Sequence, residues 1–293
     1  MKELSGVGVA LVTPFQEKGM VDFAGLERLV RHISKGVDYL VVMGTTGESP
    51  TITPEEQMTV LDFILEINAE KLPVVFGLGG NDTKSVGERM KNFAAEGVSA
   101  FLTASPAYSK PTQEGIFRHY KYLSEASPLP IILYNVPGRT ASNVLPSTVF
   151  RIAEETDKVI GIKESAGSID QVKELAASLP KDFLLLSGDD PLLVEHMSAG
   201  GHGIISVVAN AYPNRFRAVF DACTKGDFIE AQKLHAQMMP VIDALFEEGN
   251  PGGIKETLQH LGICEHHMRL PLYPVSKEHS LKLYRAIAEL GEQ

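Results

Sequence analysis

Residues 159–165 read Val-Ile-Gly-Ile-Lys-Glu-Ser, a short apolar run that ends in a lysine. A run of this kind, bounded by turn residues, predicts a buried strand. Burial disfavours the charged form of an amine, so a lysine at the end of such a strand is costly unless it is paired. Taken alone, the segment favours a lysine whose ammonium extends to solvent. An amine of lowered pKa is also what attack on a carbonyl substrate requires, so the rest of the chain must decide between the two interpretations.

Seven further apolar runs recur along the chain and alternate with segments of helical periodicity. The predicted strands are 8–12, 39–43, 74–76, 100–103, 131–134, 159–163, 183–186 and 203–207. Helix start signals stand between them, such as Thr53-Pro54-Glu55-Glu56, which offers an N-cap, an early proline and acidic residues near the positive end of the helix dipole. Strands that are apolar throughout and alternate with helices are typical of a parallel sheet covered on both faces. We therefore expect the α/β class and, at this length, a (β/α)8 TIM barrel rather than an open sheet.

The alternation stops near residue 225. From residue 227 onward only helical patterns occur, over 228–246, 253–261 and 276–290. Pro240 predicts a kink in the first of these helices, and Ser276 predicts an N-cap for the last. We expect a catalytic barrel domain over residues 1–225 and a C-terminal helical domain over 226–293, packed on the barrel or on a neighbouring subunit.

The composition argues against several functional classes. The formal net charge is −10 with the acidic residues spread along the chain, which argues against binding to nucleic acid or to a membrane surface. The two cysteines, Cys223 and Cys264, provide no disulfide framework. The N-terminus lacks the features of a signal peptide, and no apolar stretch is long enough to cross a bilayer. We therefore expect a soluble, cytoplasmic protein.

Polar residues follow several of the predicted strands, where a (β/α)8 barrel carries its reacting groups. Residues 44–49 read Gly-Thr-Thr-Gly-Glu-Ser, and their hydroxyls and glycine-flanked N–H groups suit a small carboxylate. Tyr108 follows the fourth strand, Tyr134 ends the fifth with Arg139 beyond it, and Lys163 ends the sixth. A nucleophile, hydroxyls for proton transfer and a carboxylate clamp would therefore meet at one rim.

Each residue has a simpler interpretation when it is taken singly. A tyrosine is more often an amphipathic core residue, Arg139 more often forms a surface ion pair, and the threonine pair more often caps a turn. Residues 264–267, Cys-Glu-His-His, lack a second pair at zinc spacing, so we expect a solvated helix end and no metal site. Asp189-Asp190 could bind Mg²⁺, but a helix N-cap before Pro191 is the simpler interpretation. The coincidence of the other residues at strand ends favours a catalytic site.

Three segments resemble the dihydrodipicolinate synthase family of the pyruvate-dependent Schiff-base aldolases. They are GTTGE at 44–48, YNVPGRT at 134–140 and GIKE at 161–164, and the likeness covers essentially the whole chain. The resemblance implies a class I lyase that condenses pyruvate with L-aspartate 4-semialdehyde to 4-hydroxy-tetrahydrodipicolinate, the first committed step of lysine and diaminopimelate biosynthesis. The second threonine of GTTGE and the Pro-Gly-Arg turn favour this activity over the alternative, an aldolase acting on a sugar acid, such as N-acetylneuraminate lyase or 2-keto-3-deoxygluconate aldolase. A third alternative, a non-catalytic barrel that binds a small acid, is disfavoured by the presence of the lysine, both tyrosines and the threonine together.

The resemblance also implies how pyruvate is held. Lys163 would form an imine with pyruvate, and Thr46 with adjacent backbone N–H groups would bind its carboxylate. Backbone groups at Gly188 and Ile205 would line the pocket near the lysine. No metal or organic cofactor is expected, because the lysine imine serves as the electron sink.

Further roles follow from the same resemblance. Thr45, Tyr134 and Tyr108 would form a proton relay, in which Tyr108 reaches in from a neighbouring subunit of a homotetramer, a dimer of dimers. Arg139 would position the lid over that relay and bind the carboxylate of the semialdehyde.

The chain departs from lysine-inhibited members of the family around their effector site. Those members supply histidine, glutamate and tyrosine there. The corresponding positions here are Pro54 or Gln57, Ser85 and Ala107, whereas Asn81 and Ser49 remain. We therefore expect lysine to inhibit weakly or not at all.

Overall fold

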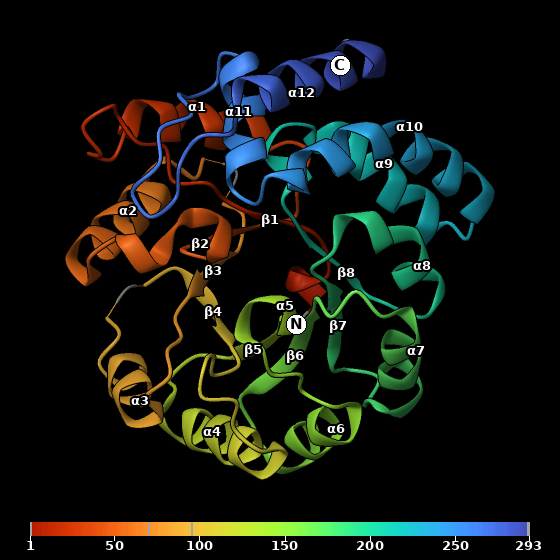
Figure 1. The fold of residues 1–293 in the computed structure, drawn as a ribbon. Helices are drawn as coiled ribbons and strands as arrows, with labels where there is room; N and C mark the ends of the chain where they lie inside the picture. Colours follow the sequence, from red (N-terminus) through yellow and green to blue (C-terminus); the bar gives the residue numbers. More distant parts are fainter. Residues whose placement is uncertain (1, 70, 95, 292–293) are drawn as a thin grey trace.

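Eight parallel strands form a closed barrel in the computed structural model, which describes residues 2–69, 71–94 and 96–291. Each strand pairs with its neighbours in the chain, and β8 pairs with β1 to close the barrel. The strands are β1 (Gly6–Ala10), β2 (Tyr39–Val42), β3 (Val74–Gly77), β4 (Val98–Ala104), β5 (Ile131–Asn135), β6 (Val159–Glu164), β7 (Leu184–Ser187) and β8 (Gly203–Ser206). Figure 1 shows them enclosed by a ring of helices. The predicted (β/α)8 barrel is confirmed.

Helices follow the strands in turn and cover the outside of the barrel (Figure 1). They are α1 (Phe23–Ile33), α2 (Pro54–Ile67), α3 (Thr83–Lys91), α4 (Gln113–Ala126), α6 (Pro146–Glu155), α7 (Ile169–Ser178), α8 (Leu193–Ser198) and α9 (Pro213–Thr224), with the single turn α5 (Pro137–Thr140) directly after β5. The predicted start of α2 is confirmed, because the Thr53 side chain accepts from the backbone N–H of Glu56 and the Glu56 carboxylate accepts from that of Thr53. None of the described helices combines the length and the apolar character needed to cross a membrane.

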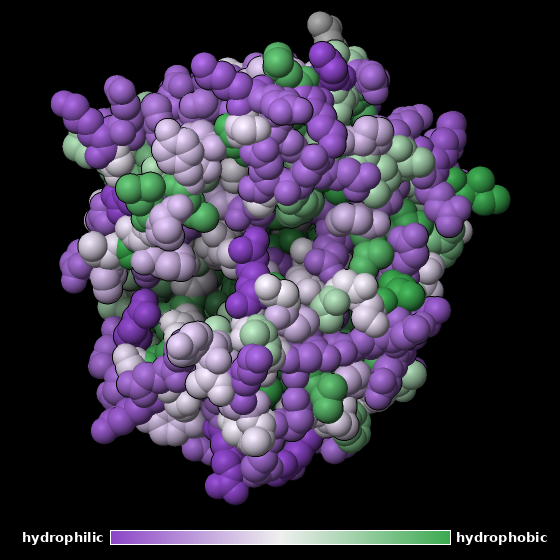
Figure 2. All heavy atoms as spheres, viewed as in Figure 1, coloured by the Kyte–Doolittle hydropathy of each residue, from purple (hydrophilic) through white to green (hydrophobic). Residues whose placement is uncertain are grey.

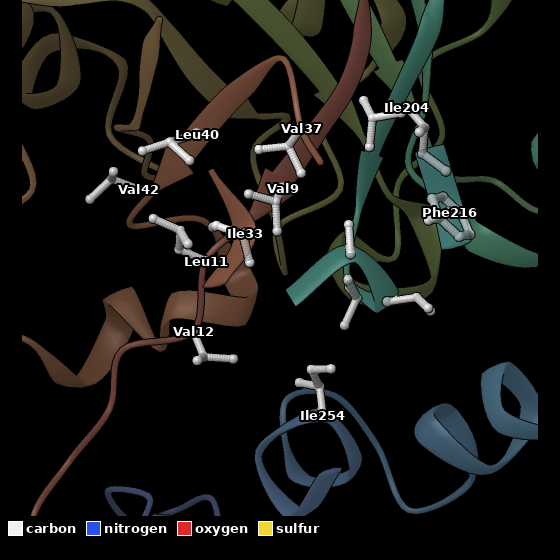
Figure 3. Close-up of a cluster of buried hydrophobic side chains, with 14 of the residues drawn as sticks. Val9, Leu11, Val12, Ile33, Val37, Leu40, Val42, Ile204, Phe216 and Ile254 are labelled. Carbon is white, nitrogen blue, oxygen red and sulfur yellow. The ribbon is translucent and has the colours of Figure 1, made fainter. Parts of the chain in front are cut away.

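Alternate residues of each strand divide the apolar core into two layers. In β2, Tyr39 and Val41 pack inside the barrel with side chains such as Ile205 of β8. Leu40 and Val42 belong to the larger cluster between the strands and the helices, part of which Figure 3 shows. Both faces of the sheet are therefore buried, which explains why the strands are continuous apolar runs in the sequence.

The first strand begins and ends two residues earlier than predicted. The Val12 N–H donates to Oδ1 of Asn210 (3.2 Å), in the turn after β8, and Nδ2 of Asn210 donates to the carbonyl of Ala10 (2.8 Å). A side chain thus replaces strand pairing at this rim. The predicted strand over residues 8–12 was wrong in its bounds: pairing with β8 begins at Gly6, and the Asn210 contacts explain why the strand ends at Ala10.

The described chain ends in helices α10 (Phe228–Glu247), α11 (Gly252–His260) and α12 (Lys277–Leu290). Pro240 lies inside α10, and Ser276 caps α12 by accepting from the His279 N–H (3.1 Å). These helices share the outer apolar cluster with the barrel, and Figure 3 shows Ile254 of α11 pointing toward Val12 after β1. The helical region therefore packs on the barrel of its own chain. A domain boundary at residue 225 stays a prediction.

Candidate active site

Lys163 lies near the carboxyl end of β6 with only 6% of its surface exposed. Its Nζ lies 4.3 Å from the ring centroid of Tyr134, because the two residues are directly paired between β5 and β6. Gly188, after β7, packs against the lysine, since a Cβ at this glycine would lie 2.6 Å from Cε of Lys163. The ammonium therefore lies against an aromatic face inside the rim, and the alternative of a lysine that extends to solvent is excluded.

Two acidic side chains lie within electrostatic reach of this lysine. Burial raises the pKa of Asp189, and raises that of Asp190 to about 6, while the Lys163 charge acts in the opposite direction on both. Asp190 is fully buried, and the hydroxyl of Ser206 donates to its carboxylate (2.5 Å). Asp190 therefore links the segment after β7 to the end of β8.

The predicted helix N-cap by Asp189-Asp190 does not form. Asp189 occupies the N-cap position of the short 3₁₀ helix η4 (Asp190–Leu192), but its side chain makes no cap hydrogen bond there. Its carboxylate instead accepts from the N–H of Gly167, after β6 (3.1 Å). The capping prediction is wrong because both carboxylates bond elsewhere: Asp189 accepts from the loop after β6, and Asp190 accepts from the N–H groups of Val207 and Val208 (3.0 and 3.3 Å).

Glu164 has no predicted role, although it stands in the GIKE segment beside the lysine. It is 3% exposed, and its carboxylate accepts from Nδ2 of Asn135 (3.0 and 3.1 Å), Nε2 of Gln171 (3.0 Å) and the N–H of Ala166 (2.7 Å). Burial raises the pKa of Glu164, and these hydrogen bonds oppose that shift. Glu164 therefore links the ends of β5 and β6, next to the point where Tyr134 and Lys163 contact each other. In the sequence, the signal for this role was a charged residue directly after a predicted buried strand.

The GTTGE segment forms a tight turn at the end of β2. Thr45 and Thr46 lie in the 3₁₀ helix η2 (Thr45–Gly47), where Thr45 is half-buried and Thr46 is 3% exposed. Glu48 follows with a left-handed φ of 58° and is fully buried. Its carboxylate is ion-paired with Lys255 of α11 and accepts from the N–H of Arg269 (3.2 Å). The C-terminal region therefore anchors the turn that carries both threonines.

A cavity of about 550 Å³ opens at this rim, and Figure 2 shows the face hollowed near β3 and β4. Of the predicted site residues, Thr45, Tyr134 and Arg139 line it. Lys163 does not, but the Tyr134 ring both lines the cavity and contacts the lysine ammonium. The structure thus brings Thr45, Tyr134 and Lys163 into one neighbourhood, with room for small substrates.

The remaining predicted residues lie around this group. Ile205 is fully buried in the same inner cluster as Tyr134. Arg139 is exposed on α5. Tyr108 is 91% exposed, has a φ of 68° and does not line the cavity. Its N–H donates to the carbonyl of Thr140 (3.2 Å), so the Tyr108 segment is tied to α5 while the phenol points to solvent.

The closed barrel, with a buried lysine stacked on a tyrosine at its carboxyl rim, defines the class of (β/α)8 enzymes that form a Schiff base with a carbonyl substrate. The model of the dihydrodipicolinate synthetase family matches residues 3–290, and the chain belongs to this family. It is 48% identical over 284 residues to the 4-hydroxy-tetrahydrodipicolinate synthase of Flavobacterium psychrophilum, covering 97% of each chain. The predicted family is confirmed.

Solved structures agree with this assignment. Dihydrodipicolinate synthase from Thermotoga maritima superposes with a TM-score of 0.95 at 40% identity, covering 98% of each chain. A monomeric dihydrodipicolinate synthase variant gives the same TM-score and identity, covering 99% of this chain and 97% of the other. The barrel with its C-terminal helices is therefore the fold of the family.

Proposed function

We propose that the chain condenses pyruvate with L-aspartate 4-semialdehyde to give 4-hydroxy-tetrahydrodipicolinate, the first committed step of lysine biosynthesis. The matching family and the full-length relatives named for this activity support it over an aldolase acting on a sugar acid. The observation that carries the mechanism is the buried amine of Lys163 against the Tyr134 ring.

The proposed reaction begins when Nζ of Lys163 attacks the ketone carbon of pyruvate and water leaves, which forms an imine. The imine withdraws electrons from the adjacent methyl group, and loss of a methyl proton gives an enamine. The enamine carbon attacks the aldehyde carbon of the second substrate, whose oxygen takes up a proton. The amine of that substrate then attacks the imine carbon, closes the ring and releases Lys163. Tyr134 and Thr45 would carry the protons, since both line the cavity next to the lysine.

Carboxylate recognition completes the proposal. Thr46 and the N–H groups of its turn would hold the pyruvate carboxylate, and backbone groups of Gly188 and Ile205 would line the pocket near the lysine. Arg139 would bind the carboxylate of the semialdehyde, because it is the exposed guanidinium on the turn after β5 and lines the cavity.

The exposed Tyr108 supports assembly into a homotetramer of two tight dimers. The Tyr108 phenol is 91% exposed and so packs little against its own chain, while its backbone lies beside α5 at the cavity rim. In a dimer this side chain would enter the site of the neighbouring subunit and complete the relay of Thr45 and Tyr134. A cytoplasmic location is proposed with it, as suits a biosynthetic enzyme.

Weak or absent lysine inhibition also remains part of the proposal. Ser49, Gln57, Asn81 and Ala107 all line the cavity. The side chain of Gln57 already takes part in hydrogen bonds within the chain, since its Nε2 donates to the carbonyls of Ser49 (3.1 Å) and Ile52 (3.0 Å). Arg89 lines the same cavity, and its charge would repel an ammonium group.

Trapping with borohydride tests the proposed mechanism. With pyruvate present, reduction should leave a covalent adduct on the peptide containing residues 161–165. Lys163→Ala should fold but form no adduct and lose nearly all turnover. Lys173→Ala is the matched control because this lysine is exposed on α7. An adduct on another lysine, or none with the unmodified enzyme, would contradict the mechanism, and faster turnover with sugar-derived aldehydes would favour the sugar-acid alternative.

A further inference from the structure

We propose that Asn250, between α10 and α11, is a positioning residue that orients the Thr46 hydroxyl toward the carboxylate of pyruvate. This inference rests on the proposed function, in which Thr46 binds that carboxylate. It gives the C-terminal helical region a part in substrate binding, although the cavity and the lysine belong to the barrel.

The contact joins two residues that are 204 positions apart in the chain. Nδ2 of Asn250 donates to Oγ1 of Thr46 at 3.0 Å. Thr46 is 3% exposed and Asn250 is half-buried, so little water competes for the contact. Within the described part of the chain, this is the one hydrogen bond that the Thr46 hydroxyl makes.

The direction of this hydrogen bond determines what the hydroxyl can do. A threonine hydroxyl has a single proton to donate and two lone pairs that accept. Because the Asn250 amide occupies a lone pair of Thr46, the hydroxyl proton is left for another acceptor. A bound carboxylate is a suitable acceptor, since hydrogen bonds to charged groups are the stronger ones. The amide thus selects the rotamer of the hydroxyl in which Thr46 donates to the substrate.

The position of Asn250 is held by neighbouring contacts with the same turn. Lys255, on the first turns of α11, is ion-paired with Glu48, two residues after Thr46. The N–H of Lys255 also donates to the carbonyl of Pro251 (3.0 Å), the residue next to Asn250. The segment is therefore attached to the GTTGE turn at two points, which favours a preorganised donor.

The other atom of the same amide argues against a purely structural role. Oδ1 of Asn250 is buried and has no hydrogen-bond partner among the described residues. A buried acceptor without a partner destabilises a fold, so an amide is a poor choice here for stability alone. The Nδ2 group, which donates to Thr46, then explains why an asparagine stands at this position.

The test compares pyruvate binding in single and double variants, measured as the pyruvate concentration that gives half-maximal borohydride adduct. Asn250→Ala should weaken binding about tenfold, as expected for losing the orientation of one charge-assisted hydrogen bond. Asn250→Asp keeps the shape but can only accept and adds a negative charge, so it should bind pyruvate less well than Asn250→Ala. In the Thr46→Val background, which lacks the hydroxyl, Asn250→Ala should have less than about a twofold further effect.

Asn68→Ala is the matched control. Asn68 also bonds through its side chain, to the backbone of Leu72 (2.7 and 3.1 Å), but lies at the end of α2, so pyruvate binding should not change. The inference is overturned if Asn250→Ala binds pyruvate like the unmodified enzyme, or if its effect is undiminished without the Thr46 hydroxyl. If Asn250→Ala does not fold, the isosteric Asn250→Asp provides the test. The inference is then overturned if Asn250→Asp binds pyruvate as well as the unmodified enzyme does. Absence of any adduct in the unmodified enzyme would instead refute the proposed function.

Discussion

Replacing Lys255 by methionine should strongly destabilise the fold. Both Lys255 and Glu48 are fully buried and form an ion pair between α11 and the GTTGE turn. The ammonium also donates to the carbonyl of His267 (2.8 Å) and lies 4.4 Å from the ring centroid of Phe15. Lys255→Met preserves most of the side-chain volume but leaves the Glu48 carboxylate buried without its cation.

The expected cost is large because the unpaired carboxylate remains away from water. Removing one partner of a buried pair costs about 3–5 kcal/mol in unfolding free energy, whereas an exposed pair contributes about 0–1 kcal/mol. Lys282→Met is the matched control, since Lys282 is ion-paired with Glu247 but their side chains are 60% and 48% exposed. A double variant, Lys255→Met with Glu48→Gln, should recover part of the loss because no buried charge remains unpaired.

Urea unfolding at one protein concentration measures these differences, because association between chains would otherwise change the apparent stability. The reasoning would be refuted if Lys255→Met lost no more unfolding free energy than Lys282→Met. It would also be refuted if the two changes were additive, so that the double variant lost the sum of the unfolding free energies lost by Lys255→Met and by Glu48→Gln separately. The two sites would then act independently.

Four further predictions concern the site and its surroundings. Arg139→Ala should impair use of aspartate semialdehyde far more than pyruvate imine formation; equal loss in both assays would make Arg139 structural. Tyr108→Phe and Lys163→Ala chains should each be inactive alone, and co-expression should restore partial activity in verified heterodimers if the tyrosine acts across the interface. Free lysine should leave the condensation rate nearly unchanged at sub-millimolar concentration, and strong inhibition there would contradict the proposal. Burial lowers the pKa of His119 to about 4, so the unfolded chain binds a proton that the folded chain resists, and stability should fall as the pH drops from about 6.5 toward 4. His119→Gln should reduce that fall in urea midpoints measured across this range.

Features that depend on neighbouring residues could be predicted from the sequence alone. Apolar runs buried on both faces predicted the strands, and Thr53 with Glu56 predicted the start of α2, because periodicity and capping act within a few residues. Lys163 and Tyr134 could each be placed at a strand end in the same way. Their direct pairing between β5 and β6, however, depends on the register of the barrel.

Contacts between residues far apart in the chain could not be predicted in this way, because they depend on the folded structure. Asn210 ends β1 from 198 residues away, Lys255 pairs with Glu48 over 207 residues, and Asn250 reaches Thr46 over 204. A sequence pattern shows that a polar group near a strand end needs a partner, but many distant side chains could supply one. The partner is selected when the barrel closes and α11 packs against it, since only then do the two side chains lie within hydrogen-bonding distance.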